Sequence, residues 1–531
     1  MKRINANEIA IIVLIFVAIL LGTFLRVSVV LMDDFPRNDG GLFWAMTRDL
    51  VNNHFALPRY TTYNQDSIPF AYPPAAFYII GFLNHFFQIS LVSLFRFFPL
   101  ICNILVLFLI YPITNLVLQS KPQALFALYA YAIILPSYDW LLMGGGVTRA
   151  LGQLFATLAI FATLAGAISH KRRWLFLSVF SIVIAGYSHI EIAWRAAILM
   201  VFLFYLVDRT QRTIWFVLIH LGSGIILLSP YWLTILLKHG AGPFIYAFQS
   251  GNTAALTTLG LIFVPNYTAE PYFQVLAVLG FLGIFASLAS RQYIPVLWLV
   301  LVILTDPRSL HRSAALPEAM LIAISLDVFI IQGLGNIERN LSDQVKHPHL
   351  RVRPRFRLPI PFPYATAAIL ILYAFLLAVA SFPSFRTSNA LSQSEQEAFS
   401  WSADHTRQDA KFLIFPASSS WVNDWISEWF PALSLRQNIL TVQGYEWTES
   451  LYGLRQEIYF ELVKCLRSNS PCYKAWLAKY HLSCDYLLIP RRSELIAKKL
   501  IDSDVLSFQG MLDGCTLAYQ NNDIDIYKCS K

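Results

Sequence analysis

Charge is scarce in this sequence. Only 14% of its 531 residues are Asp, Glu, Lys or Arg, whereas 56% are hydrophobic and 15% are aromatic. A soluble protein of this composition could not cover its surface with polar side chains, and disordered chains need low hydrophobicity and high charge. The scarcity excludes both classes and indicates several segments embedded in lipid.

Several catalytic motifs are also missing. The sequence has no glycine-rich phosphate-binding loop, no HExxH helix, no paired CxxC site and no nucleophile elbow. It therefore gives no support for a nucleotide-driven motor or for one of the common classes of hydrolase. Cysteine is rare, and five of the six are in the last 70 residues: Cys465, Cys472, Cys484, Cys515 and Cys529. If that region lies outside the cytoplasm, one or two disulfides are expected there.

Long apolar runs dominate the first 382 residues. We count eleven candidate membrane spans, at 9–32, 96–118, 123–137, 147–168, 173–189, 193–208, 213–236, 272–289, 292–305, 316–335 and 363–382. The first follows a short basic N-terminus and lacks a small-residue cleavage site, which is typical of a retained signal anchor. Residues 73–87 are too short for a span and begin with two prolines, so we expect a helix lying along the membrane interface.

The net charge of +8 is unevenly distributed. Residues 383–531 contain 15 Lys and Arg and 17 Asp and Glu, so the basic excess belongs to residues 1–382. With the N-terminus in the cytoplasm, the inner segments carry fifteen basic side chains and the outer loops six, as the positive-inside rule requires. No nucleic acid partner is needed, since basic loops such as 346–357 suit contact with anionic membrane lipids.

These patterns predict a polytopic α-helical membrane protein with a C-terminal extracytoplasmic α/β domain. The transmembrane domain covers 1–382, with a first outer loop at 33–92 that carries juxtamembrane helices, and the outer domain covers 383–531. Its sequence indicates short strands at 411–416, 439–442 and 484–490 and helices at 423–430, 451–466 and 493–502. Trp421, Trp425 and Trp429 have helical spacing, which favours a packed face.

Ionisable residues beside apolar spans are the informative positions, and on this topology they gather on the outer side. Asp39 precedes Gly40 and Gly41 at the start of an amphipathic segment, 42–50, where free backbone N–H groups can hold a carboxylate in a fixed direction. A positioned carboxylate is what a general base requires, but a simple helix cap would have the same spacing.

Two further outer loops carry charged residues beside glycine or proline. In the stretch 138–149 (YDWLLMGGGVTR), Asp139 precedes three glycines and Arg149 follows them. Glycines allow the backbone to approach a ligand closely, and an Arg at this place can bind phosphate. The stretch 306–312 (DPRSLHR) forms a cationic cluster of Arg308, His311 and Arg312. A flexible turn with a snorkelling Arg, or ordinary headgroup contact, is the alternative in each case.

The short turn 187–191 (YSHIE) places His189 two residues before Glu191. Such a pair can ligate a divalent cation when a further carboxylate, from Asp39 or Asp139, converges on it. Two helix ends joined by a hydrogen-bonded pair would give the same pattern.

Together these residues resemble the GT-C superfamily of membrane glycosyltransferases, which includes protein mannosyltransferases and lipid A aminoarabinose transferases. The resemblance rests on 38–43 (NDGGLF), on 72–78 (YPPAAFY) and on some eleven spans followed by an outer domain. The segments 428–433 (EWFPAL) and 443–447 (QGYEW) are similar to the outer domain of bacterial members. The resemblance implies a catalytic acidic residue in the first outer loop, here Asp39, and a polyprenyl-phosphate sugar donor.

The chain departs from the superfamily pattern at two places. Tyr72 stands where some relatives have a Lys that contacts the donor phosphate, so Arg149 or the cluster of Arg308, His311 and Arg312 would take that role. Glycines replace the usual second acidic motif, and the nearest carboxylate is Asp139.

The reaction that the resemblance implies is inverting transfer of a sugar to a lipid, glycan or protein acceptor in the cell envelope, outside a bacterial plasma membrane. Asp39 would deprotonate the acceptor hydroxyl in a single displacement. Positive charge for the leaving phosphate would come from the arginines or from Mg²⁺ or Mn²⁺ held by His189, Glu191 and Asp139. Trp44, Tyr72 and Tyr138 would line the substrate cleft.

Two other classes of protein remain open. A transporter or flippase of a lipid-linked substrate would usually place its polar residues near mid-membrane, whereas these lie at span ends. A non-catalytic assembly protein would use Trp421, Trp425 and Trp429 to bind a partner.

Overall fold

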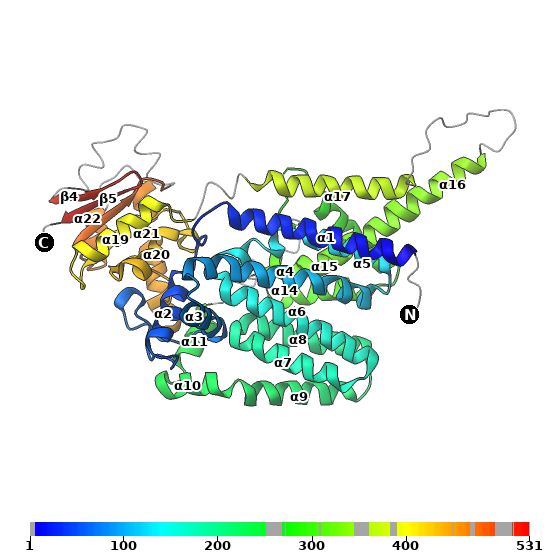
Figure 1. Ribbon diagram of the computed structural model, residues 1–531, viewed down its shortest axis with the longest axis horizontal. Helices are drawn as coiled ribbons and strands as arrows, with labels where there is room; N and C mark the ends of the chain where they lie inside the picture. Colours follow the sequence, from blue (N-terminus) through cyan, green and yellow to red (C-terminus); the bar gives the residue numbers. More distant parts are fainter. Residues whose placement is uncertain are drawn as a thin grey trace.

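Helices that run side by side form the larger part of the molecule, and a small α/β domain lies at one end of them (Figure 1). The computed structural model describes residues 6–250, 268–270, 272–306, 309–344, 361–382, 390–449, 451–467, 473–493, 512 and 514–529. The basic stretch 346–357 and, apart from Ser493, the predicted helix 493–502 lie outside the described residues.

The helical part is built from apolar segments whose backbone hydrogen bonds are internal, as lipid requires. Its helices are α1 (Ala6–Leu31), α4 (Leu91–Leu118), α5 (Lys121–Ile133), α6 (Gly146–Ser169), α7 (Arg172–Ser188), α8 (Ile190–Val207), α9 (Arg212–Leu227), α10 (Ser229–His239), α11 (Gly242–Ser250), α13 (Val275–Ala289), α14 (Tyr293–Thr305), α15 (Leu310–Ser325), the π-helix η5 (Leu326–Leu334), α16 (Gly335–Gln344) and α17 (Phe362–Ala380).

Among the described residues, six helices are long and apolar enough to cross a membrane, or eight if each of two bent pairs counts as one span. The pairs bend by 85° between α5 and the segment after it and by 49° between α9 and α10. The chain is thus an integral membrane protein with the predicted polytopic fold, and the number of eleven spans stays a prediction.

The first loop forms two short helices beside the C-terminal domain, α2 (Gly41–Asn52) and α3 (Ala75–Phe87). At 1.5 Å per residue, the 13 residues of α3 extend about 20 Å, less than the roughly 30 Å of a hydrocarbon core. Phe82 and Phe86 on α3 are exposed apolar residues, and the location of the helix along the membrane interface stays a prediction. The N-terminus lies at the opposite end of the bundle (Figure 1).

The C-terminal domain contains a five-stranded sheet in the order β2-β1-β3-β5-β4, in which β1 pairs in parallel with β2 and β3 and the other pairs are antiparallel. Its strands are β1 (Lys411–Ile414), β2 (Gln437–Asn438), β3 (Tyr486–Pro490), β4 (Cys515–Gln520) and β5 (Ile524–Cys529). Its helices are α19 (Gln393–His405), α20 (Trp425–Ser434), α21 (Leu451–Arg467) and α22 (Tyr473–Lys479).

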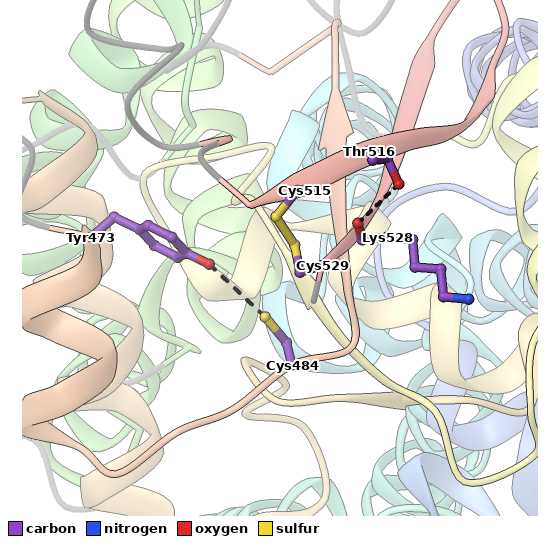
Figure 2. Close-up of a disulfide and its surroundings, with 6 residues drawn as sticks. All are labelled: Tyr473, Cys484, Cys515, Thr516, Lys528 and Cys529. Atoms are coloured by element: carbon purple, nitrogen blue, oxygen red, sulfur yellow. Dashed lines mark hydrogen bonds between the residues drawn. A yellow bond between two sulfur atoms is a disulfide. The ribbon is translucent and has the colours of Figure 1, made fainter. Parts of the chain in front are cut away.

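The sequence located two of these strands well and missed others. The predictions at 411–416 and 484–490 match β1 and β3, but the strand expected at 439–442 is wrong, because β2 ends at Asn438. The side-chain Oδ1 of Asn438 accepts the Leu440 N–H (3.1 Å) and turns the chain. A disulfide joins Cys515 of β4 to Cys529 of β5, while Cys484 is free and lies 3.9 Å from the Tyr473 hydroxyl (Figure 2).

Helix α20 packs the domain against the first loop. The Trp429 ring, fully buried, meets the rings of Phe35 (4.8 Å between centroids) and Trp44 (5.7 Å). Trp421 instead packs on Tyr452 within the domain, and Trp425 lies under Arg492. The packed face expected of the tryptophans is therefore present at Trp425 and Trp429, which are buried in one cluster with Phe35 and Phe95, but not at Trp421.

Candidate functional site

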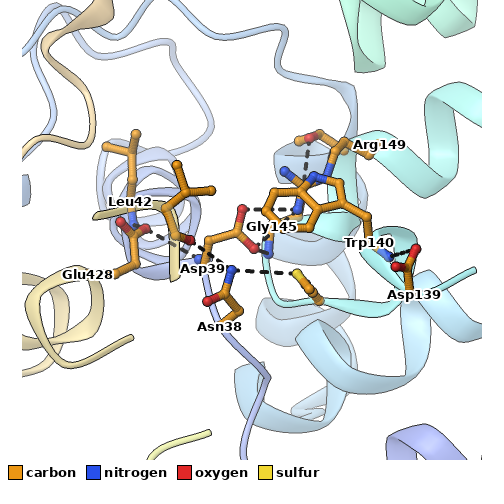
Figure 3. Close-up of polar contacts among 12 residues, drawn as sticks. Asn38, Asp39, Leu42, Asp139, Trp140, Gly145, Arg149 and Glu428 are labelled. Carbon is orange, nitrogen blue, oxygen red and sulfur yellow. Dashed lines mark hydrogen bonds and ion pairs between the residues drawn. The ribbon is translucent and has the colours of Figure 1, made fainter. Parts of the chain in front are cut away.

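Asp39 lies in a sharp turn immediately before α2. Gly40 is the N-cap residue of this helix and has a φ of 136°, which favours glycine. No side chain of the turn caps the helix. The cap comes from the C-terminal domain, since Oε1 of Glu428 accepts the Gly40 N–H (3.3 Å) and the Leu42 N–H (3.2 Å) (Figure 3). The Asp39 carboxylate is thus available for other contacts.

Asp39 forms an ion pair with Arg149 at the head of α6. Nη2 of Arg149 donates to Oδ2 (2.9 Å) and Oδ1 (3.1 Å) of Asp39, and the Gly145 N–H also donates to Oδ1 (3.1 Å) (Figure 3). The two side chains are 13% and 12% exposed, so both remain accessible. Because a carboxylate has about four acceptor positions, these three bonds leave one free on Oδ2.

Glycine at position 145 makes this approach possible. A Cβ there would lie 2.5 Å from Oδ2 and 2.7 Å from Cγ of Asp39. The backbone bond from the Gly145 N–H to the Asp39 carbonyl (2.9 Å) holds the two loops together. The glycine run that the sequence linked to close backbone approach therefore contacts Asp39 itself.

Two more arginines join the cluster. Nη1 of Arg195 contacts Asp306 (2.7 Å), and its Nη2 pairs with Glu191. The charge of Arg312 interacts with those of Arg149, Arg195, Asp139 and Asp306. Burial raises the pKa of Asp306, and the adjacent Arg195 opposes the rise. The sequence analysis singled out Arg312 but missed Arg195. Arg195 could have been found as a lone charged residue inside an apolar span, four residues after Glu191.

Two guanidinium nitrogens in this cluster are buried without a hydrogen-bond partner among the described residues, Nε of Arg149 and Nη1 of Arg312. Buried donors are nearly always paired in native proteins, so each needs an explanation. Spare donors on two neighbouring guanidinium groups suit a phosphate, which accepts several such bonds. Arg308 lies outside the described residues, and His311 is exposed beside Arg312.

One of the three aromatic residues predicted to line the cleft, Tyr72, interacts with the charged cluster. The Tyr72 hydroxyl accepts a bond from Thr148 (3.3 Å), and Tyr72 interacts electrostatically with Asp39, Arg149 and Glu191. Burial raises the pKa of Tyr72 to about 12, so its hydroxyl stays protonated.

The other two aromatic residues make packing contacts, and their place in a substrate cleft stays a prediction. Trp44 faces Trp429 and Phe95, at 5.7 and 5.5 Å between ring centroids, and Tyr138 is fully buried beneath Arg26. Trp140 lies against the guanidinium of Arg149, with Cζ 5.0 Å from its ring centroid, a contact the sequence did not indicate.

The predicted metal ligands are engaged elsewhere. Nδ1 of His189 accepts the Ile192 N–H (3.4 Å) and caps α8, Glu191 pairs with Arg195, and Oδ1 of Asp139 accepts the Trp140 N–H (2.6 Å). In the part of the chain that the structure describes, no three His, Cys, Asp or Glu side chains gather as a metal site would require. Binding of Mg²⁺ or Mn²⁺ by these residues therefore stays a prediction.

Glu428 makes the stability of the protein depend on pH. Burial raises the pKa of Glu428 from 4.5 to about 8, and the neighbouring Asp39 adds to the rise. Between these pH values the folded protein binds a proton that the unfolded chain releases, so the free energy of unfolding falls as the pH rises from about 4.5 to 8.

We therefore expect Glu428→Gln to flatten the pH profile of stability. Glutamine keeps an oxygen for the Gly40 and Leu42 N–H groups and does not titrate. From pH 5 to pH 8.5 the melting temperature of the native protein should fall relative to that of Glu428→Gln, because only the native side chain at this position titrates over the range. Glu397→Gln, at an exposed site of α19, is the control. Parallel profiles for Glu428→Gln and the native protein would contradict the expectation.

Comparison with solved structures identifies the fold. The chain is similar to the oligosaccharyltransferase AglB from Archaeoglobus fulgidus in complex with an inhibitory peptide and a dolichol-phosphate, at 15% identity and a TM-score of 0.55, covering 99% of this chain and 75% of that one. It is also similar to ArnT from Cupriavidus metallidurans bound to undecaprenyl phosphate, at 11% identity and a TM-score of 0.50, covering 98% of both chains.

A further structure of the Archaeoglobus fulgidus oligosaccharyltransferase, in complex with Zn and sulfate, matches at 13% identity and a TM-score of 0.51, covering 90% of this chain and 68% of that one. No protein-family profile matches the chain, and no curated protein sequence matches it. The solved structures are GT-C superfamily membrane glycosyltransferases. The GT-C fold inferred from the sequence is thereby confirmed.

Proposed function

We propose that this chain is a membrane glycosyltransferase that moves a sugar from a polyprenyl-phosphate donor to an acceptor at the end of the bundle where the C-terminal domain lies. The observation that carries the proposal is the contact of Asp39 with Arg149 and Gly145, on a fold shared with ArnT and AglB. It joins a partly exposed carboxylate to a group of arginines in one place. The disulfide between Cys515 and Cys529 supports an extracytoplasmic location for that end.

Asp39 is the general base of the proposed reaction. The acceptor hydroxyl gives its proton to Oδ2 of Asp39 while its oxygen forms a bond to the anomeric carbon. The bond from that carbon to the phosphate oxygen breaks, and both electrons leave with the lipid phosphate. Attack opposite to the leaving group inverts the anomeric centre.

Arginine charge stabilises the leaving phosphate. The spare donors on Arg149 and Arg312 are suited to the phosphate oxygens, and Arg195 adds positive charge beside them. Arg149 already pairs with Asp39, so one guanidinium would link the base to the leaving group. The protonated hydroxyl of Tyr72 is a further donor in the same cluster.

A transfer assay separates this function from transport. The full-length protein in liposomes is given undecaprenyl phosphate carrying labelled monosaccharides, with peptide, glycan and lipid acceptors. The proposal requires release of undecaprenyl phosphate together with labelled acceptor. Movement of the intact labelled lipid across the bilayer without release would favour a flippase instead.

Substitution at Gly145 offers a steric test of the same site. The Cβ of Gly145→Ala would displace the Asp39 carboxylate, so we expect kcat to fall about 10²-fold, the effect of misplacing a catalytic group by about 1 Å. Gly453→Ala is the control, because a Cβ at this exposed position of α21 meets nothing within 4 Å. Equal kcat values for the two variants would contradict the role of the Gly145 contact.

A further inference from the structure

Two consecutive residues of α20 bind the main chain on both sides of Asp39. The indole N–H of Trp429 donates to the Asn38 carbonyl (2.8 Å), and Glu428 accepts the Gly40 N–H. We propose that Glu428 and Trp429 are positioning residues for the transfer reaction, through which the C-terminal domain fixes the direction of the Asp39 carboxylate. This inference rests on the proposed function of Asp39.

The turn around Asp39 is held by contacts on both of its sides. Asn38 and Gly40 have φ angles of 53° and 136°, in the left-handed range that Asn and Gly adopt more readily than other residues. On one side, the Gly144 N–H donates to the Arg37 carbonyl (2.8 Å) and the Gly145 N–H to that of Asp39. Glu428 and Trp429 hold the other side.

The fit between α20 and the turn is close. A Cβ at Gly41 would lie 2.2 Å from the Glu428 carbonyl oxygen, and one at Gly40 would lie 2.9 Å from Cζ2 of Trp429. The Tyr63 hydroxyl donates to the same Glu428 carbonyl (2.8 Å), which fixes the start of the helix. Gly41 thus serves contact with the C-terminal domain, whereas Gly40 lies between that domain and Gly144, whose carbonyl carbon would be 2.8 Å from its Cβ.

The charges around Glu428 favour this role. The titratable groups that face it are Asp39, Glu446 and Tyr63, and Tyr445 lies beyond Tyr63. Burial and the acidic neighbours keep Glu428 neutral below about pH 8. Glu428 can therefore accept both N–H groups without adding a second negative charge beside the base.

The test compares Glu428→Ala, Glu428→Gln and Trp429→Phe in the full-length protein, with Glu397→Ala as the matched control on the same domain. We measure kcat and the KM for the donor, amide hydrogen exchange in peptides that cover residues 36–46, and the melting temperature. For Glu428→Ala we expect kcat to fall about 10- to 100-fold with an unchanged KM, and faster exchange of the turn. Glu428→Gln should restore both, and Trp429→Phe should resemble Glu428→Ala.

The possible outcomes separate this inference from the proposed function. Native kcat and native exchange in a folded Glu428→Ala variant would overturn the positioning role. A Glu428→Gln variant as impaired as Glu428→Ala would overturn it too, because the acceptor oxygen would not be what matters. Faster exchange in Glu428→Ala, combined with full transfer by Asp39→Asn, would sustain the contact and refute Asp39 as the base.

Discussion

Asp39→Asn is expected to lower kcat by about 10²- to 10⁴-fold, the usual contribution of a general base. Asparagine has the same shape and can still accept bonds from Arg149 and Gly145, but it cannot take the proton of the acceptor hydroxyl. The melting temperature and the affinity for undecaprenyl phosphate should therefore stay near those of the native protein. Steady-state transfer, thermal unfolding and titration with undecaprenyl phosphate check the three expectations.

Asp34→Asn is the matched control for this substitution. Asp34 lies on the same loop, and its side chain is exposed. The Asp34→Asn variant should transfer sugar at the native rate. If Asp39→Asn also did so, the base would have to be sought elsewhere in the cluster.

Arg149→Gln is expected to have the second large effect, a loss of about 10²- to 10³-fold in kcat, which is typical when one stabilising donor at a developing anion is removed. The substitution removes both the partner of Asp39 and the spare Nε donor. Arg149→Lys should be intermediate, because an ammonium can pair with Asp39 but lacks the additional guanidinium donors.

Two comparisons make the Arg149 result specific. Arg407→Gln, which changes an exposed arginine of the C-terminal domain, should leave kcat unchanged. The double variant Asp39→Asn with Arg149→Gln should lose much less than the product of the single losses, since the two groups act together. Fully multiplicative losses would mean that the ion pair is not part of the reaction.

The sequence could predict what local pattern determines. Apolar runs indicate helices because lipid forces the backbone to bond internally, and Asp39, Arg149 and Arg312 stand out because ionisable groups are costly near lipid. Their meeting agrees with the prediction. Their chemical roles stay predictions.

The rest of the site depends on contacts between distant segments. Glu428 caps a helix 388 residues before it along the chain, and no periodicity marks that partner. Spacing alone also predicted that His189 and Glu191 bind a metal. In the structure His189 accepts the Ile192 N–H and Glu191 pairs with Arg195, both on α8. Trp44 and Tyr138 are aromatic residues in the right segments, but only three-dimensional packing shows that Tyr138 is fully buried and that Trp44 is partly buried against Trp429.

The link between Glu428 and the start of α2 also bears on when the proposed transfer could begin during synthesis of the chain. At roughly 5–20 residues per second, the 388 residues between the two partners take the ribosome about 20–80 seconds to add. Until the C-terminal domain emerges and folds, the turn that holds Asp39 lacks half of its supports. A nascent chain truncated before residue 428 should therefore be inserted yet transfer sugar far more slowly than the full chain.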